Sequence, residues 1–206
     1  MQSTTKYILT LGISTLILTT GCSQKTVNID MNNDTGGAVM GLDYRDFQSS
    51  AQEMTESVIS SGALNKPDGG KYILAISKIT NDTMQHIDTD QLIKKIRVGL
   101  LKSGKVVVTT AISANGAEDN MAMQVRKDLR ANDEFKQSTV AKKGTMIAPD
   151  LSLSGKIIQK NIKMDSDTQR AEYYFQMSLT DIKTGLALWE DEKVIGKQGS
   201  NKAAAW

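Results

Sequence analysis

The amino-acid sequence predicts an α/β domain of the α+β kind, in which helices pack on a mixed β-sheet. Two observations support this fold class. A strand–helix–strand run occupies residues 71–110, and strands joined by little more than turns fill residues 150–195. The first pattern favours parallel strands joined by a right-handed crossover. The second favours an antiparallel meander, because short turns can join only antiparallel neighbours.

Helical periodicity begins shortly after residue 41. Apolar residues recur there at three- and four-residue spacing, which places them on one face of a helix: Tyr44, Phe47, Ala51, Met54 and Val58. Gly62 is expected to end this helix, since glycine tolerates the left-handed conformation of a C-terminal cap.

Two further helices and a short fourth are predicted. Asp88 is expected to cap the second helix, in which Leu92, Ile96 and Leu100 point toward the core. A third helix is predicted over residues 117–131, around Met121, Val125 and Leu129, and a short fourth over 137–144.

The strands are predicted from apolar runs and from alternation. Residues 71–79 are apolar on both alternating faces, which indicates a central buried strand, and 106–110 form the next. Residues 150–164 form a third strand, in which Gly155 marks a bulge or a close approach between chains. Apolar residues alternate with polar ones around residues 173–179, and a turn leads into a last strand over 186–195.

The N-terminus has the pattern of a lipoprotein signal. Lys6 precedes an apolar segment over residues 7–18, and small residues lead to Cys22, the only cysteine. At 1.5 Å per residue, about a dozen residues are too short to cross a hydrocarbon core of about 30 Å. The segment resembles a bacterial lipobox, which implies that residues 1–21 are removed and that the Cys22 thiol carries lipid. Ser23 follows, where aspartate would signal retention in the inner membrane, so the outer membrane is favoured.

The lipid-bearing cysteine is expected to start a flexible linker over residues 22–41, followed by a globular domain over 42–196 and a flexible tail over 197–206. The linker is rich in Asn, Asp and Gly and has no sustained period. About 20 residues span about 70 Å when fully extended and about 25 Å as a coil.

No catalytic, metal or cofactor site is predicted. A zinc site needs several nitrogen or sulfur ligands, whereas the chain has one histidine, His86, and its one cysteine is expected to carry lipid. The net charge of +2 includes no dense basic run with aromatic residues between, so nucleic-acid binding is not supported. We therefore expect no enzyme activity and no small-molecule substrate.

Four sequence stretches, in this order and behind a lipobox, resemble the LpoB family of lipoprotein activators. They are LDYRDF at 42–47, ILAISKITNDTMQHIDTDQLIKKIRVGLLKSGKVVVTT at 73–110, APDLSLSGKI at 148–157 and TGLALW at 184–189. The resemblance implies a fold like the N-terminal domain of TolB. It also implies a non-catalytic protein, anchored in the outer membrane and facing the periplasm. Its expected partner is the regulatory domain of a bifunctional class A penicillin-binding protein of the 1B type, whose peptidoglycan synthesis it would raise.

The partner-binding site is predicted in the loop over residues 80–87, because loops on a rigid scaffold commonly carry function. This loop offers amide, carboxylate, hydroxyl, thioether and imidazole groups, from Asn81, Asp82, Thr83, Met84 and His86. The alternative is that Asn81, Asp82 and Thr83 only form turn hydrogen bonds and cap the next helix. In that case the interface is expected on the open face of the C-terminal meander.

Two other functions share parts of this pattern. A structural or secretion lipoprotein of the TolB-like or curli-pore kind has a similar strand–helix–strand run, but a pore subunit should assemble into a ring. A monomer by light scattering would argue against it. A hydrolase with an unrecognised site would be indicated by a pocket containing carboxyl groups with strongly shifted pKa values.

Overall fold

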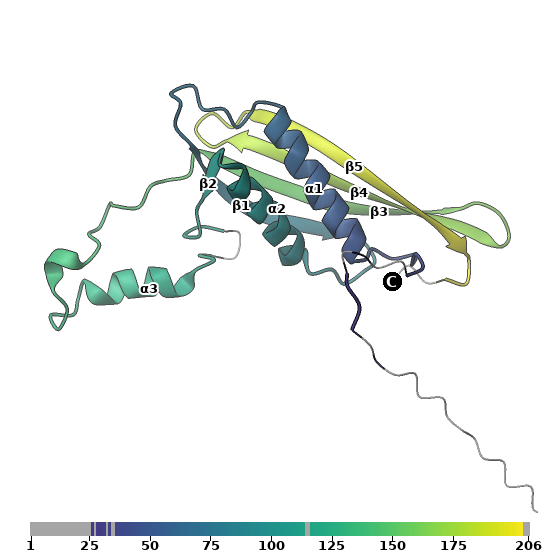
Figure 1. Ribbon diagram of the computed structural model, residues 1–206, viewed down its shortest axis with the longest axis horizontal. Coiled ribbons are helices and arrows are strands. Elements are labelled where there is room, and N and C mark those ends of the chain that lie inside the picture. The colour runs from purple at the N-terminus through teal and green to yellow at the C-terminus, as the bar shows by residue number, and fades with distance from the viewer. Residues whose placement is uncertain (1–25, 27, 32, 34–35, 114–115, 204–206) are drawn as a thin grey trace, which may run out of the picture. The chain divides into compact units, whose positions relative to one another are not determined.

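The computed structural model describes residues 26, 28–31, 33, 36–113 and 116–203. The chain divides into two units, Met1–Asp30 and Met31–Trp206. In the first unit the described residues are exposed and belong to no helix or strand. Cys22 and the predicted signal peptide lie outside the described residues, so the lipid anchor stays a prediction. All helices and strands below belong to the second unit (Figure 1).

The first two helices form where the apolar period predicts them. Helix α1 spans Tyr44–Ser60 and helix α2 spans Thr89–Ser103, with Asp43 and Asp88 as their N-caps. At α1 a capping box is complete: Asp43 accepts the N–H of Asp46 at 3.2 Å, and Asp46 accepts the N–H of Asp43 at 2.8 Å. Gly104 ends α2 in the left-handed conformation, at φ 69°.

Five strands form one mixed sheet, which confirms the predicted fold class. They are β1 (Tyr72–Asp82), β2 (Val106–Val108), β3 (Leu151–Lys163), β4 (Thr168–Asp181) and β5 (Ala187–Ser200), in the order β2-β1-β3-β4-β5. Strand β1 is parallel to both β2 and β3, and α2 is the connection from β1 to β2. Strands β3, β4 and β5 form the antiparallel meander.

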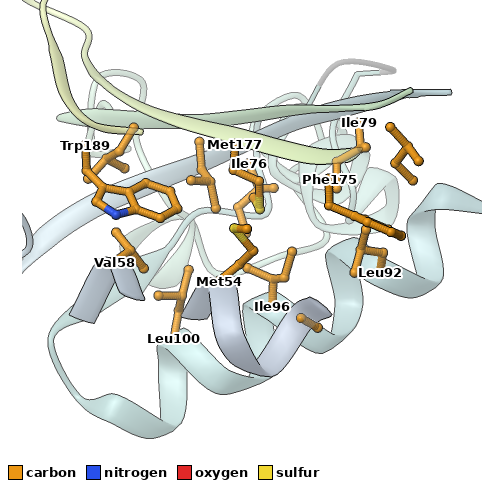
Figure 2. Close-up of a cluster of buried hydrophobic side chains, with 14 of the residues drawn as sticks. Met54, Val58, Ile76, Ile79, Leu92, Ile96, Leu100, Phe175, Met177 and Trp189 are labelled. Atoms are coloured by element: carbon orange, nitrogen blue, oxygen red, sulfur yellow. The ribbon is translucent and has the colours of Figure 1, made fainter. Parts of the chain in front are cut away.

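The hydrophobic core lies between one face of the sheet and helices α1 and α2. Figure 2 shows Met54 of α1 and Ile96 of α2 pointing toward Ile76, Phe175 and Met177 of the sheet. On β4 the buried residues are every second one, from Ala171 to Leu179. The intervening side chains therefore lie on the opposite face of the sheet, because successive strand residues point to opposite sides.

The third helix is shorter than predicted and contributes no residue to the core. Helix α3 spans Asn120–Leu129, and none of its residues is buried. Met121 and Val125, which led to the prediction, are exposed. The predicted fourth helix is reduced to a 3₁₀ turn, η1 (Gln137–Thr139). The guanidinium of Arg126 donates to Thr145 at 2.8 Å, so that α3 is bonded to the chain that returns beside it.

The folded unit begins before the predicted boundary at residue 42. Met40 and Gly41 are buried, and the Tyr173 hydroxyl donates to the carbonyl of Met40 at 3.0 Å. These two residues therefore belong to the domain and not to the linker.

The predicted C-terminal tail is partly wrong, because β5 continues to Ser200. Thr168, at the start of β4, pairs with Ser200. The length of β4 therefore allows the polar residues at the end of β5 to form a strand, although their sequence does not suggest one. Lys197, placed in the tail by the sequence, forms an ion pair with Asp46 at 2.7 Å, and both side chains are largely buried.

Replacing the N-cap Asp43 by alanine is expected to lower the free energy of unfolding by about 1 kcal/mol at neutral pH. Burial alone would raise the pKa of Asp43, but hydrogen bonds from Arg45 and Asp46 and the charge of Lys197 outweigh it and lower the pKa below 3.8. Ionised Asp43 therefore stabilises the folded state above the pKa of the unfolded chain. This stabilisation is lost as the pH falls through the lower folded-state pKa.

Urea unfolding between pH 7 and pH 2 measures this effect. The stability curves of the parent and the Asp43→Ala variant should converge at the acidic end. The control is Asp119→Ala, which removes the cap of α3, where Asp119 accepts the N–H of Ala122 at 2.9 Å. Because α3 buries no residue, this control should leave global unfolding unchanged. Equal losses in the two variants would contradict the prediction.

Candidate functional site

The predicted loop is shorter than expected, since β1 runs on to Asp82. Thr80, Asn81 and Asp82 are strand residues, paired with Lys156, Ile157 and Ile158 of β3. The polar sequence of these residues does not indicate a strand, because β3 supplies the backbone hydrogen bonds regardless of side-chain character. The connection to α2 therefore consists of residues 83–88, the last being the N-cap Asp88.

Asn81 and Thr83 form turn hydrogen bonds, as the alternative interpretation predicts, but the next helix is capped by Asp88 and not by these residues. The Asn81 amide donates to the carbonyl of Gln85 at 2.8 Å, and the Thr83 hydroxyl lies 2.8 Å from Asn81 Oδ1. The N–H of Gln85 returns to the Thr83 hydroxyl at 3.1 Å. These side chains shape the loop, and Thr83 in particular is half-buried.

Gln85 fixes the loop to the start of the domain. Its Oε1 accepts the N–H of Leu42 at 2.9 Å. Gly41 lies so close that a Cβ atom there would be 2.3 Å from Gln85 Nε2, so a larger residue at 41 would displace the Gln85 side chain. The sequence did not indicate this residue, because its partner is a backbone group 43 positions away.

Four of the five predicted residues, Asn81, Asp82, Met84 and His86, are exposed at the surface, and Thr83 is half-buried. Met84 is 72% exposed, and its N–H donates to Gln159 Oε1 of β3 at 3.0 Å. Its sulfur lies 3.3 Å from the amide nitrogen of Asn161. The loop therefore lies directly against β3, and its exposed thioether is continuous with polar groups on that strand.

Asp82 lies on the open face of the sheet, away from the helices. Its carboxylate forms an ion pair with Lys156 at 2.7 Å. On the same face Ile158, Tyr174 and Val194 stand in register across β3, β4 and β5. The three side chains of this row are on the sheet face that points away from the core, and residues directly opposite one another on neighbouring strands can interact.

Tyr174 is the aromatic residue of this open face. Its hydroxyl donates to Glu172 at 2.6 Å, and the Lys160 ammonium lies 4.8 Å from the centre of its ring. Hydrogen bonding to Glu172 raises the pKa of Tyr174. The phenol therefore stays protonated at neutral pH, and the ring is set between a cation and an anion. We call the open-face residues Asp82, Lys156, Ile158 and Tyr174, together with Met84 of the adjoining loop, the loop–sheet surface. Met84 itself contacts Gln159 and Asn161, which alternate onto the other face of β3.

Within the described residues, no group of three or more histidine, cysteine or acidic side chains is placed to bind a metal ion. No described helix is both long enough and apolar enough to cross a membrane.

The fold is that of an α/β domain, with helices on one face of the sheet and charged, apolar and aromatic side chains on the open face. The family model described as "Peptidoglycan-synthase activator LpoB" matches residues 46–195. The chain belongs to the LpoB family, a family of regulatory activators in peptidoglycan synthesis.

Several solved structures match this chain at low identity. The LpoB C-terminal domain from Salmonella enterica is 12% identical, with 73% of this chain and 98% of that chain covered and a TM-score of 0.42. The same domain from Escherichia coli is 13% identical, with 74% and 99% covered and a TM-score of 0.42. Lipoprotein GNA1162 from Neisseria meningitidis is 13% identical, with 65% and 86% covered and a TM-score of 0.35. Comparison with curated proteins gives no match.

Proposed function

We propose that this protein is an outer-membrane lipoprotein, anchored by lipid on Cys22, which activates a bifunctional class A penicillin-binding protein in the periplasm. It binds the regulatory domain of that synthase and raises glycan polymerisation and cross-linking. The observation that carries the proposal is the LpoB family match, which runs from the start of α1 into β5 and so spans the folded domain. The lipobox sequence at Leu18–Cys22 supports the anchor.

The synthase contacts the loop–sheet surface in this proposal. Met84 is highly exposed yet held at its backbone by Gln159, so a partner meets an apolar side chain at a defined position. Methionine adapts its shape to a partner, and tyrosine supplies a large contact area with few rotatable bonds. Asp82, Lys156, Lys160 and Glu172 offer both signs of charge on the open face that carries Tyr174. A surface of this kind favours a specific protein partner over a uniformly charged polymer.

Co-purification from envelope extract tests the function directly. The full chain should retain a class A penicillin-binding protein, and adding it should raise the rate of glycan synthesis by that purified synthase. Failure to bind any such synthase from the same cell would refute the proposal.

Met84→Ala, His86→Ala and Tyr174→Ala are expected to weaken synthase binding by about 1 kcal/mol or more each, because contact residues in an interface commonly cost that much on truncation. The surface positions Met84 and His86 should change folding stability by no more than about 0.5 kcal/mol. Binding is measured by surface plasmon resonance, and stability by thermal unfolding of the same samples.

Met121→Ala is the matched control, because Met121 is a methionine on α3 that is 68% exposed. It should bind like the parent. If both loop variants bind like the parent and Tyr174→Ala is weakened, the interface lies on the open sheet face alone. If only Met121→Ala is weakened, the interface lies on α3 and the loop–sheet surface is not the contact.

A further inference from the structure

A cavity of about 380 Å³ lies between β1, the first half of α2 and the segment that leads to α3. Its walls come from β1 at Ile76 and Lys78, from α2 at Ile93 and Lys94, and from Ala117. This volume is within the range of about 300–1,000 Å³ that is typical of small-molecule sites. The cavity is separate from the loop–sheet surface and shares no residue with it.

Arg97 lines this cavity and is an under-satisfied buried cation. Its side chain is only 8% exposed, and its guanidinium forms an ion pair with Glu118. Among the described residues, no acceptor reaches the buried Nε–H of Arg97. A guanidinium has five N–H donors, and one carboxylate can engage only some of them. A buried donor without a partner among the described residues calls for an explanation, and a bound acceptor is one.

The charged residues that line the cavity carry a net positive charge, which favours an anionic ligand. Lys78, Lys94 and Arg97 are cationic, whereas Asp90 and Glu118 are the acidic residues of the lining. Burial lowers the pKa of Arg97, which means that the charged guanidinium loses hydration without full compensation. A ligand carboxylate in the cavity, added to those of Asp90 and Glu118, would balance the three cationic residues and accept a hydrogen bond from the Arg97 Nε–H.

The other lining residues limit which chemical groups can be attached to the ligand's carboxylate. Ile76, Ile93 and Ala117 are apolar and leave space for a short aliphatic group, while Ser77 and Asn120 can bond an amide. A carboxylate, a methyl-sized side chain and an amide are together the chemistry of a peptide C-terminus ending in a small residue. We propose that this cavity binds such a ligand, with its carboxylate on Arg97 and its aliphatic group against Ile93 and Ala117.

N-acetylalanine, in both enantiomers, is the probe, and N-acetylalaninamide is the matched compound that lacks the carboxylate. Titration is followed by amide chemical shifts of Ser77, Ile93 and Ala117 in the full domain. We expect saturable shifts with a Kd of about 1–10 mM for the acid, as suits a ligand of this size, and none for the amide. The same shifts with both compounds, or none below about 50 mM, would overturn the proposal.

Two substitutions should act in opposite directions. Arg97→Gln should weaken binding tenfold or more, because hydrogen bonds to charged groups are lost. Glu118→Gln should tighten binding about threefold or more, because Glu118 competes with the ligand for the same guanidinium. A purely structural ion pair would give no such gain, so unchanged or weaker binding by Glu118→Gln would refute the proposal.

If Arg97→Gln does not fold, the double variant Lys78→Gln/Lys94→Gln replaces it, with an expected loss of about fivefold. The control is Arg126→Gln, since Arg126 bonds to Thr145 and does not line the cavity. It should bind the acid like the parent. Equal affinities of the lysine double variant and the parent would overturn the charge assignment on which the proposal depends.

Discussion

Replacing Cys22 by alanine is expected to abolish lipid attachment and to release the protein from the membrane fraction, as a soluble or an uncleaved periplasmic form. Each buried methylene contributes about 0.8 kcal/mol to membrane binding, so the loss of several acyl chains removes the anchor entirely. Labelling with radioactive palmitate and membrane fractionation measure the two effects. Labelling that survives in the Cys22→Ala variant would show that the lipobox interpretation is wrong.

Ser23→Ala is the matched control for this experiment, because it changes the neighbouring residue and keeps the thiol. It should be labelled and should fractionate with the outer membrane like the parent. Ser23→Asp should keep the label and shift the protein toward the inner membrane, since aspartate after the cysteine is the retention signal. Synthase stimulation by purified Cys22→Ala protein should be unaffected, which separates anchoring from activation.

Gly155→Ala is expected to destabilise the domain by about 1–3 kcal/mol, the usual cost of forcing extra atoms into a packed interior. Gly155 lies in β3, between Ile79 of β1 and Met177 of β4. A Cβ atom at this position would be 2.8 Å from the backbone oxygen of Gln176 and 3.3 Å from Met177 Cγ. Because the nearest atom belongs to the backbone of a paired strand, it cannot move away without disturbing the sheet.

Gly196→Ala is the matched control, since Gly196 is also a strand glycine and a Cβ atom there would meet no heavy atom within 4 Å. It should be neutral or slightly stabilising, because alanine reduces the freedom of the unfolded chain. Urea unfolding measures both variants. The midpoint of Gly155→Ala should fall, while the slope of the free energy of unfolding against urea concentration stays constant. Equal midpoints for the two variants would contradict the close approach at Gly155.

Much of the fold could be predicted because the decisive signals are local. In α2, Asp88 precedes an apolar period formed by Leu92, Ile96 and Leu100, and the structure caps and buries these residues as expected. In β4 the alternation around Tyr173 and Phe175 specifies which face meets the helices. The sequence predicts a bulge or a close approach at Gly155 of β3, and the structure shows the close approach.

The two errors in strand length share one cause, which is that strand pairing does not depend on apolar side chains. Thr80–Asp82 look like a loop in the sequence and extend β1, because β3 runs beside them. Residues 197–200 look like a tail and extend β5, because β4 is long enough to pair with them. Conversely, Met121 and Val125 in α3 have a helical period but no surface to pack on.

The class of domain, its two packed helices, its family resemblance and the exposed side chains of Met84 and His86 can be inferred from the sequence alone, because period, capping and turn chemistry act within a few residues. Which groups meet across the chain is known only from the three-dimensional structure. Asp82 pairs with Lys156, Tyr173 bonds to Met40, and Arg97 is buried against Glu118. Such contacts depend on strand register and helix packing between distant segments, and no local pattern in the sequence encodes the distance between two side chains.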